Sequence, residues 1–197
     1  MIKAVLFDMD GVLIDSHDAW FHIFNRAYNH FEGKTISRAD FDKHLWAKAF
    51  DIVAKDRFTV PLEKIRQFYR DIYTEYRERL VIMPEAKNTL SMLQKKKIDL
   101  VVVSNSQRAI VTKVLKDVGL VDYFKFCLGG DDVKNGKPSP DILIKALEQL
   151  NLIPKDVIFI GDTIWDKMAA EKAGIKFVGF RLDGNRIEAL PALVGMV

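Results

Sequence analysis

Two aspartates, Asp8 and Asp10, follow directly on a short apolar run near the start of the chain. The run, Ala-Val-Leu-Phe over residues 4–7, is bounded by charge and glycine, which is typical of a buried strand. Because side chains alternate along a strand, both carboxylates would project to the same side if the strand continued through them. Two negative charges at such a short distance repel each other unless a cation lies between them. The pair therefore suits a metal-dependent acid–base site, and it also suits a capped strand end followed by a turn.

Five strand-like runs recur along the chain, and helical patterns of ordinary length separate four of them. Their alternation with helices predicts right-handed β-α-β units and a parallel sheet that is covered on both faces. The expected fold class is α/β, with a Rossmann-like core. The runs cover residues 3–8, 99–104, 125–128, 157–161 and 176–180.

The segment between the first two runs breaks this rhythm. Residues 17–80 contain no convincing strand but carry several amphipathic helical patterns. An insertion of this length is too long for a connecting loop, and its aromatic residues suffice for a small core of its own. We therefore predict a helical cap domain over 17–80, inserted into a core domain formed by 1–16 and 81–197. Its two apolar stripes are Trp20, Phe24, Ala27 and Phe31, and Ile65, Phe68, Tyr69, Ile72 and Tyr76.

Polar side chains follow three of the predicted strands at the point where each strand ends. Ligands of open parallel sheets bind beyond the carboxyl ends of the strands, so these side chains should meet at one edge of the sheet. Lys137, in the loop before a later helix, should reach the same edge. Carboxylates with few nitrogen ligands suit Mg²⁺, and a lysine near a helix N-terminus favours an anion, so we expect a metal-assisted phosphate site. The residues at these strand ends are Asp8 and Asp10 after the first run, Ser104, Asn105 and Ser106 after the second, and Gly161, Asp162 and Thr163 after the fourth.

Four segments in this order resemble the haloacid dehalogenase superfamily of phosphohydrolases. Their conjunction is far more specific than any one of them, and the match covers the predicted core on both sides of the insertion. A cap inserted directly after the first motif is similar to the branch that contains phosphoglycolate phosphatases and β-phosphoglucomutase. The segments are DMDGVLIDS over 8–16, VVVSNS over 101–106, GKPSPD over 136–141 and GDTIWD over 161–166.

This resemblance assigns chemical roles to the acidic residues. Asp8 would be the nucleophile that forms an aspartyl-phosphate, and Asp10 would be the acid/base. Asp8, Asp162 and the backbone carbonyl of Asp10 would bind Mg²⁺. Asp166 would support this metal site by contacting the residues around the ligands. The chemistry is consistent with these roles, because a carboxylate that attacks a phosphate dianion needs nearby positive charge, and a second group must protonate the leaving alkoxide.

The resemblance also assigns the substrate contacts. Ser104, the Asn105 amide and Lys137 would hold the transferring phosphoryl group, and Gly11 would let the backbone approach it closely. In the cap, Lys48 falls near a position where relatives of this branch often carry a lysine that faces the substrate. The glycine that usually precedes it is Ala47 here.

Composition limits the remaining possibilities. The chain has 197 residues, 49% of them hydrophobic and 29% charged, which is ordinary for a soluble protein. No apolar segment approaches the roughly 18 residues of a membrane span, and no signal-peptide pattern precedes the first strand, so we expect a cytoplasmic protein. A net charge of +3 is too small to argue for nucleic acid. The single cysteine, Cys127, is expected to be a buried thiol, and the four histidines lack metal-ligand spacing.

The leading hypothesis is an Mg²⁺-dependent phosphatase that acts on a small phosphorylated metabolite, of the phosphoglycolate or sugar-phosphate kind. It would work as a monomer or homodimer, without nucleic acid or membrane partners. A sugar phosphomutase of the β-phosphoglucomutase type is the alternative, because its core motifs are similar. A dehalogenase is disfavoured, since that branch works without metal and lacks the second acid of the pair. A catalytically silent binding module would not need the complete set of motif residues.

Overall fold

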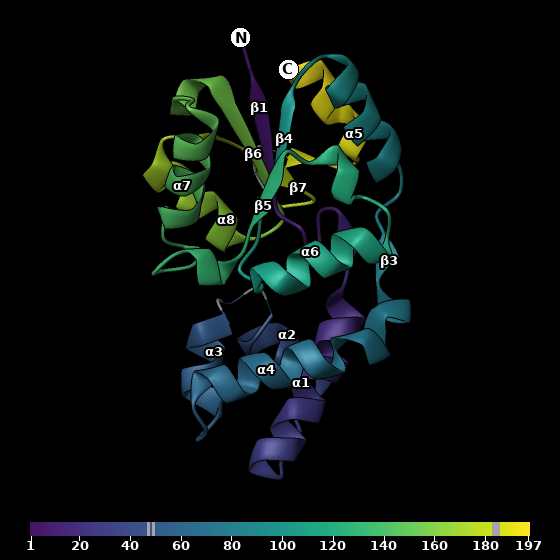
Figure 1. The fold of residues 1–197 in the computed structure, drawn as a ribbon, viewed down its shortest axis with the longest axis vertical. Coiled ribbons are helices and arrows are strands. Elements are labelled where there is room, and N and C mark those ends of the chain that lie inside the picture. The colour runs from purple at the N-terminus through teal and green to yellow at the C-terminus, as the bar shows by residue number, and fades with distance from the viewer. Residues whose placement is uncertain (47, 49, 183–185) are drawn as a thin grey trace.

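Six strands form one parallel sheet in the order β5-β4-β1-β6-β7-β8. The computed structural model describes residues 1–46, 48, 50–182 and 186–197. All five predicted runs are strands of this sheet, which confirms the α/β class (Figure 1). The sequence did not predict β8, which is too short for a periodic pattern. The strands are β1 (Ala4–Phe7), β4 (Asp99–Val103), β5 (Phe126–Leu128), β6 (Val157–Gly161), β7 (Lys176–Phe180) and β8 (Arg186–Ile187).

Helices cover both faces of the sheet, as predicted. In β1, Val5 and Phe7 belong to the hydrophobic cluster on the face of α5, α6 and the C-terminal η5. Ala4 and Leu6 belong to the opposite cluster, with α7 and α8. This alternation follows from the two-residue period of a strand, and both faces are apolar because both are buried. The covering elements are α5 (Ala86–Lys95), α6 (Arg108–Asp117), α7 (Asp141–Leu150), α8 (Ile164–Ala173) and the 3₁₀ helix η5 (Leu190–Met196).

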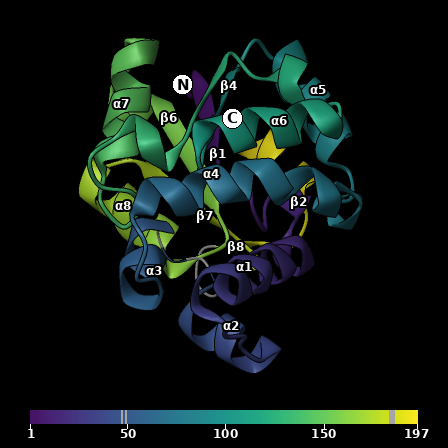
Figure 2. The same ribbon diagram turned by 60° about the horizontal axis from the view of Figure 1, so that its bottom comes forward.

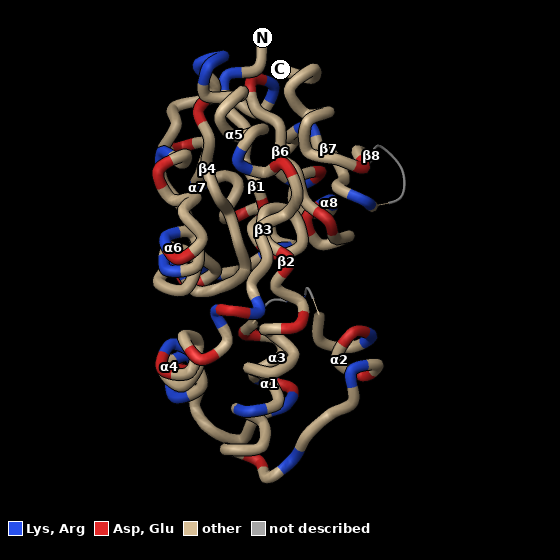
Figure 3. Tube along the Cα trace, turned by 90° about the vertical axis from the view of Figure 1, so that its right-hand side faces the viewer, with Lys and Arg blue, Asp and Glu red and all other residues tan. Residues whose placement is uncertain are grey.

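The segment 17–80, here called the cap, lies at the end of the molecule opposite both termini (Figure 1). In Figure 2, α4 and α1 are seen from the cap end. Two short antiparallel strands, β2 and β3, form the neck between the cap and the rest of the chain (Figure 3). The elements are β2 (Ile14–Asp15), α1 (His17–Glu32), α2 (Arg38–His44), α3 (Phe50–Arg57), α4 (Leu62–Ile72), the 3₁₀ helix η1 (Tyr73–Arg79) and β3 (Val81–Ile82).

Aromatic rings hold the cap helices together. Phe24 of α1 packs against Phe41 of α2, with ring centroids 6.0 Å apart, and against Phe58, which follows α3, at 5.8 Å. On α4, Ile65 and Tyr69 are buried, as the predicted stripe requires. Such ring contacts add edge-to-face attraction to the burial of apolar area. The division into a cap domain and a core domain stays a prediction, since one continuous hydrophobic cluster contains residues of both.

Short 3₁₀ helices lie in the loops of the core. They are η2 (Val121–Tyr123), η3 (Gly130–Asp132) and η4 (Pro154–Asp156). Helix α7 begins at Asp141 with Pro140 in the N-cap position, and the Ser139 hydroxyl donates to the Asp141 carboxylate. One local expectation differs from the structure. Cys127 is half-buried rather than buried, because β5 is an edge strand of the sheet.

Charged residues of both signs alternate along the core and the cap (Figure 3). Among the described residues, every helix is too short or too polar to cross a membrane.

Candidate active site

The strand order brings the predicted catalytic residues together. β1 lies between β4 and β6, and these three strands are followed by Asp8, Ser104 and Asp162 in turn. Counted outward from β1, the strands β4 and β5 lie on one side and β6, β7 and β8 on the other, so the strand order reverses beside β1, which is where open parallel sheets bind ligands. Three sequence motifs that are far apart in the chain therefore share one edge of the sheet.

Lys137 links two of the carboxylates. Its ammonium Nζ lies 2.9 Å from Asp8 Oδ1 and 2.6 Å from Asp166 Oδ1. All three side chains are buried, Lys137 being only 2% exposed. A buried charge is tolerated when it is paired in this way, and removal of one partner is costly. The lysine is thus held at the nucleophile predicted from the sequence.

Burial dominates the electrostatics of the site. It raises the pKa of the Asp8 carboxyl well above its ordinary value, with Lys137 acting in the opposite direction. For Lys137, burial favours the neutral amine, but the Asp166 and Asp8 carboxylates outweigh it and raise the lysine pKa. Burial, assisted by Asp166, also raises the pKa of Asp162 to about 7. Both carboxyl groups are therefore disfavoured as carboxylates in spite of Lys137, and a bound cation would favour their carboxylate forms.

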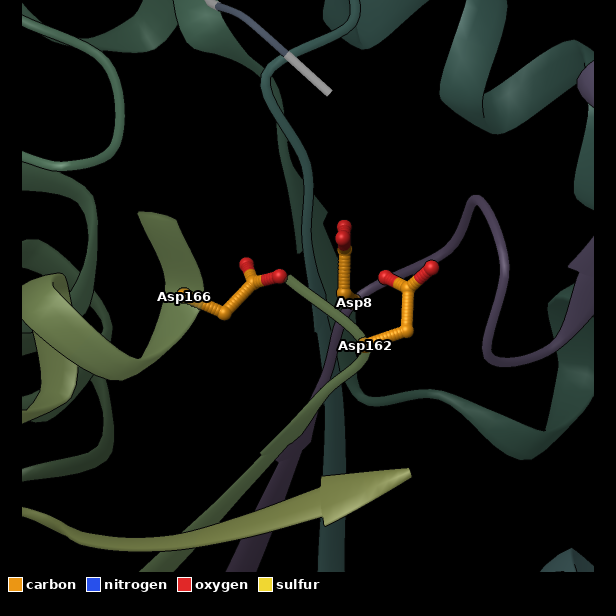
Figure 4. Close-up of side chains that lie close together, drawn as sticks. All are labelled: Asp8, Asp162 and Asp166. Carbon is orange, nitrogen blue, oxygen red and sulfur yellow. The ribbon is translucent and has the colours of Figure 1, made fainter. Parts of the chain in front are cut away.

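The acidic residues fit a divalent cation. Ligand oxygens of Asp8, Asp162 and Asp166 all lie within 4.8 Å of one another, and their carboxylates gather above the end of β1 (Figure 4). Asp162 Oδ1 is buried and has no hydrogen-bond partner among the described residues. A buried oxygen without a partner is unfavourable unless another group satisfies it. Oxygen donors without nitrogen or sulfur suit Mg²⁺, so the donor set is consistent with the expected metal.

Asp166 has both carboxylate oxygens engaged. Oδ1 accepts from Lys137, and Oδ2 accepts from the Thr163 backbone N–H at 3.1 Å and from the Thr163 hydroxyl. In return, Thr163 Oγ1 accepts from the Asp166 N–H, which completes a capping box at the start of α8. This arrangement favours a positioning role for Asp166; the support of the metal site that the resemblance implies for it stays a prediction.

The absence of a side chain at Gly11 leaves room for the Asp162 carboxylate. It adopts a φ of +78°, and a Cβ placed there would lie 1.9 Å from Asp162 Oδ2. The structure therefore gives a local reason for this glycine, because only glycine combines this backbone with so close a neighbour. A close approach of the Gly11 backbone to a phosphate stays a prediction.

Gly11→Ala should displace Asp162 and reduce activity strongly, and it should destabilise the fold by more than the roughly 1 kcal/mol that a positive φ costs. Gly33→Ala is the matched control, because Gly33 has a φ of +66° and a Cβ placed on it would meet nothing within 4 Å. Urea unfolding and phosphate release would be measured for both variants. Equal effects of the two substitutions would mean that the Asp162 contact has no importance.

The Asp10 carboxylate accepts hydrogen bonds from residues of the cap and of the core. Its Oδ1 accepts from the Ser16 hydroxyl at 2.5 Å and from the Trp20 indole N–H at 2.8 Å, while Oδ2 accepts from the Ser106 hydroxyl at 3.3 Å. Trp20 belongs to α1 of the cap. The two strong donors hold Oδ1 in place, so Oδ2 is the oxygen better placed to exchange a proton.

The loop after β4 holds Lys137 as well as the predicted phosphate site. The Asn105 side chain accepts from the Lys137 backbone N–H at 2.8 Å and donates to the Lys137 carbonyl at 3.0 Å. Ser104 is buried, and its hydroxyl accepts from the Ser106 N–H at 3.0 Å. Because the Asn105 side chain is occupied, any phosphate contact of Asn105 would come from its backbone N–H.

A cavity extends from this edge of the sheet to the cap. Asp8, Asp10, Ser104 and Lys137 line its floor. Lys48, which lies between α2 and α3, lines it from the cap side, as expected for a lysine that faces the substrate; Ala47 lies outside the described residues. The cavity has a volume of about 130 Å³ and is partly open to solvent, so a small ligand could enter it.

Sequence reasoning missed several contacts of the site. The sequence predicts Trp20 only as part of an apolar stripe, and its hydrogen bond to Asp10 depends on how α1 leaves the neck. Gln107, at the N-cap of α6, accepts from Arg70 of α4 at 2.5 Å and so ties the cap to the phosphate loop. The role of Thr163 could have been predicted, since Thr-x-x-Asp before a helix is the pattern of a capping box.

Comparisons with known proteins agree with this geometry. A family model described as haloacid dehalogenase-like hydrolase matches residues 5–180. Phosphoglycolate phosphatase of Escherichia coli (strain K12) is 28% identical over 217 residues, covering 96% of this chain and 85% of that protein. Among solved structures, a HAD-superfamily hydrolase of subfamily IA, variant 1, from Geobacter sulfurreducens has 26% identity and a TM-score of 0.81, with 100% of both chains covered. A Thermotoga maritima protein provisionally assigned as a β-phosphoglucomutase has 25% identity and a TM-score of 0.75, also with 100% of both chains covered.

Proposed function

This chain belongs to the haloacid dehalogenase-like hydrolases, and on that premise we propose that it hydrolyses a small phosphomonoester through an aspartyl-phosphate on Asp8, with Mg²⁺ as cofactor. It is a phosphoric monoester hydrolase. The observation that carries the proposal is the buried Asp8 carboxylate, paired with Lys137 and set beside the unpartnered Asp162 oxygen at the floor of a cavity. The substrate is a small phosphorylated metabolite, and the relatives named above give phosphoglycolate and sugar phosphates as the first compounds to test.

In the first half of the reaction, an Asp8 oxygen attacks phosphorus and the bond to the leaving alcohol oxygen breaks. Lys137 lies against Asp8 and lowers the repulsion between the carboxylate and the incoming dianion. Ser104, the Asn105 N–H and Lys137 hold the phosphoryl oxygens. Asp10 donates its proton to the departing alkoxide.

In the second half, water attacks the phosphorus of the aspartyl-phosphate. Asp10, now a carboxylate, takes the proton of this water, and the bond between phosphorus and Asp8 breaks. Inorganic phosphate leaves, while Asp8 is regenerated as a carboxylate and Asp10 as an acid. Its bonds to Ser16 and Trp20 keep the Asp10 carboxyl in one orientation through both halves.

Asp8, the Asp10 backbone carbonyl and Asp162 would hold Mg²⁺, with Asp166 keeping Lys137 and the start of α8 in place. When bound, Mg²⁺ supplies positive charge that stabilises the phosphoryl oxygens. Asp162 Oδ1, which lacks a partner among the described residues, would gain one.

A sugar phosphomutase remains the second candidate. The specific support is the similarity in fold and sequence to the Thermotoga maritima protein provisionally assigned as a β-phosphoglucomutase. The two outcomes differ in the acceptor of the phosphoryl group, which is water for a phosphatase and a sugar hydroxyl for a mutase. An assay with a hexose 1-phosphate that measures both the release of phosphate and the formation of the isomeric hexose phosphate separates the two functions.

Phosphate release from p-nitrophenyl phosphate should require Mg²⁺ and stop in excess EDTA, because the dianionic ester would otherwise meet uncompensated carboxylates. Asp162→Asn should raise the Mg²⁺ concentration needed for half-maximal activity, and Asp166→Asn should do so more mildly. Full turnover in EDTA would contradict the metal requirement. Equal loss in the two variants would make Asp166 a direct ligand.

A second readout of the same metal site does not depend on activity. The pKa of Asp162 is about 7 in the folded protein, above its ordinary value, so between about pH 4 and 7 the folded state binds more protons than the unfolded chain. In EDTA, the free energy of unfolding should therefore fall as the pH rises through this range. Mg²⁺ should restore it at pH 7. Asp162→Asn should reduce this pH dependence, and an unchanged slope would contradict the assignment.

A further inference from the structure

The cap side of the cavity is mainly aromatic and aliphatic. Among the described cap residues that line it, Lys48 is the one charged side chain. Its neighbours in the lining include Trp20, Leu45, Trp46, Phe50 and Tyr69. A cavity wall of this kind gains free energy by covering apolar surface of a ligand.

Three of these rings form a continuous series from α3 across α4 to α1. The centroids of Phe50 and Tyr69 lie 5.0 Å apart, and those of Tyr69 and Trp20 lie 6.2 Å apart. Phe50 and Trp20 are each half-buried and so are not simply part of the cap interior. From the core, Ile110 and Trp165 face the same cavity, so apolar groups enclose it from both parts of the molecule.

Most polar side chains that line the cavity are already engaged with the protein. The Trp20 indole N–H donates to Asp10, the Asn105 amide is paired with the Lys137 backbone, and Gln107 accepts from Arg70 and donates to the Arg66 carbonyl.

Few polar groups are left for a substrate on the cap side. The Tyr69 hydroxyl has no hydrogen-bond partner among the described residues, and Lys48 has no ion pair there. A polyol leaving group needs a partner for each hydroxyl that it buries, because an unpaired buried hydroxyl is costly. A largely apolar ring with one or two polar substituents needs only these two groups.

We propose that the substrate is a phosphomonoester whose alcohol carries an aromatic or heteroaromatic ring, with the ring packed against Phe50, Tyr69 and Trp20. Lys48 and the Tyr69 hydroxyl then bind one polar or anionic substituent of that ring. This inference rests on the proposed phosphatase function and adds the class of leaving group.

Phosphate esters of primary alcohols that differ in the presence of an aromatic ring test this inference. Benzyl phosphate carries the ring, while glycerol 1-phosphate, phosphoglycolate and glucose 6-phosphate do not, and all four leave as primary alkoxides that need protonation by Asp10. With Mg²⁺ present, kcat/KM for benzyl phosphate should exceed that of each of the other three by about tenfold or more, from burial of the ring.

Cap variants test where the preference arises. Phe50→Ala should lower the ratio of kcat/KM for benzyl phosphate to that for glycerol 1-phosphate by about fivefold, as expected for a lost ring contact. Phe50→Leu, which keeps apolar volume, should fall between. Phe68→Ala is the matched control, because Phe68 is also a partly buried cap aromatic, stacked on His30 with centroids 4.5 Å apart and absent from the cavity lining. It should leave the ratio unchanged.

The outcomes separate the two proposals. If glucose 6-phosphate or phosphoglycolate is preferred and the reaction still depends on Asp8, the ring inference is wrong and the phosphatase stands. The inference is also wrong if Phe50→Ala and Phe68→Ala change the ratio equally. If none of the four esters releases phosphate with Mg²⁺, the proposed function fails and the inference fails with it.

Discussion

Asp8→Asn should abolish phosphoenzyme and product alike, even with an activated aryl ester, with a loss in turnover on the order of 10⁶-fold. The amide cannot attack phosphorus as the carboxylate does, and each neighbouring carboxylate has another role or partner, Asp162 as a proposed Mg²⁺ ligand. Asp166 has both oxygens engaged, and Asp10 is held by Ser16 and Trp20. Acid-quenched samples analysed by mass spectrometry, together with phosphate release, measure both steps.

Loss of activity in this variant should not come from unfolding. Burial raises the pKa of Asp8, so the charged carboxylate is itself unfavourable in the folded state without a cation, and Lys137 keeps its pairing with Asp166. Asp15→Asn is the matched control, because Asp15 is an exposed aspartate of β2 outside the cavity lining. It should keep near wild-type turnover. Residual turnover in Asp8→Asn that matches Asp15→Asn would remove Asp8 from the chemistry.

The site at the edge of the sheet could be predicted because Asp8, Ser104 and Asp162 each directly follow a recognisable strand. A buried parallel strand is an apolar run, and the carboxyl ends of parallel strands meet, so Asp8, Ser104 and Asp162 were brought together without knowledge of the strand order. The observed order, with β1 between β4 and β6, places the three in neighbouring positions.

Contacts between the cap and the core could not be predicted in this way. The bond from Trp20 to Asp10 depends on the direction in which α1 leaves the neck, and β2 and β3 have only two residues each, too few for a periodic pattern. A tryptophan on an amphipathic helix is equally well explained by packing alone. The aromatic wall of the cavity could not be predicted for the same reason, since its composition depends on which face of each cap helix is turned toward the sheet.

Asp10→Asn should separate the two halves of the reaction. The variant keeps the Asp8 nucleophile, and the new amide oxygen can still accept from Ser16 and Trp20, so the local geometry should persist. An aryl phosphate has a good leaving group that needs little protonation, so Asp8 should still become phosphorylated. Hydrolysis of the aspartyl-phosphate needs a base for the incoming water and should slow by about 10²- to 10⁴-fold.

The expected time course with p-nitrophenyl phosphate is a burst of nitrophenol followed by a slow steady state. During the slow phase, the protein should gain the mass of one phosphate, mapped to the peptide that contains Asp8. A double variant, Asp8→Asn with Asp10→Asn, should give neither burst nor mass gain, because the acceptor is then missing. Benzyl phosphate should give no burst with Asp10→Asn, since its alkoxide cannot leave without a proton. Normal steady-state turnover, or a phosphate on another peptide, would mean that Asp8 and Asp10 do not divide the reaction as proposed.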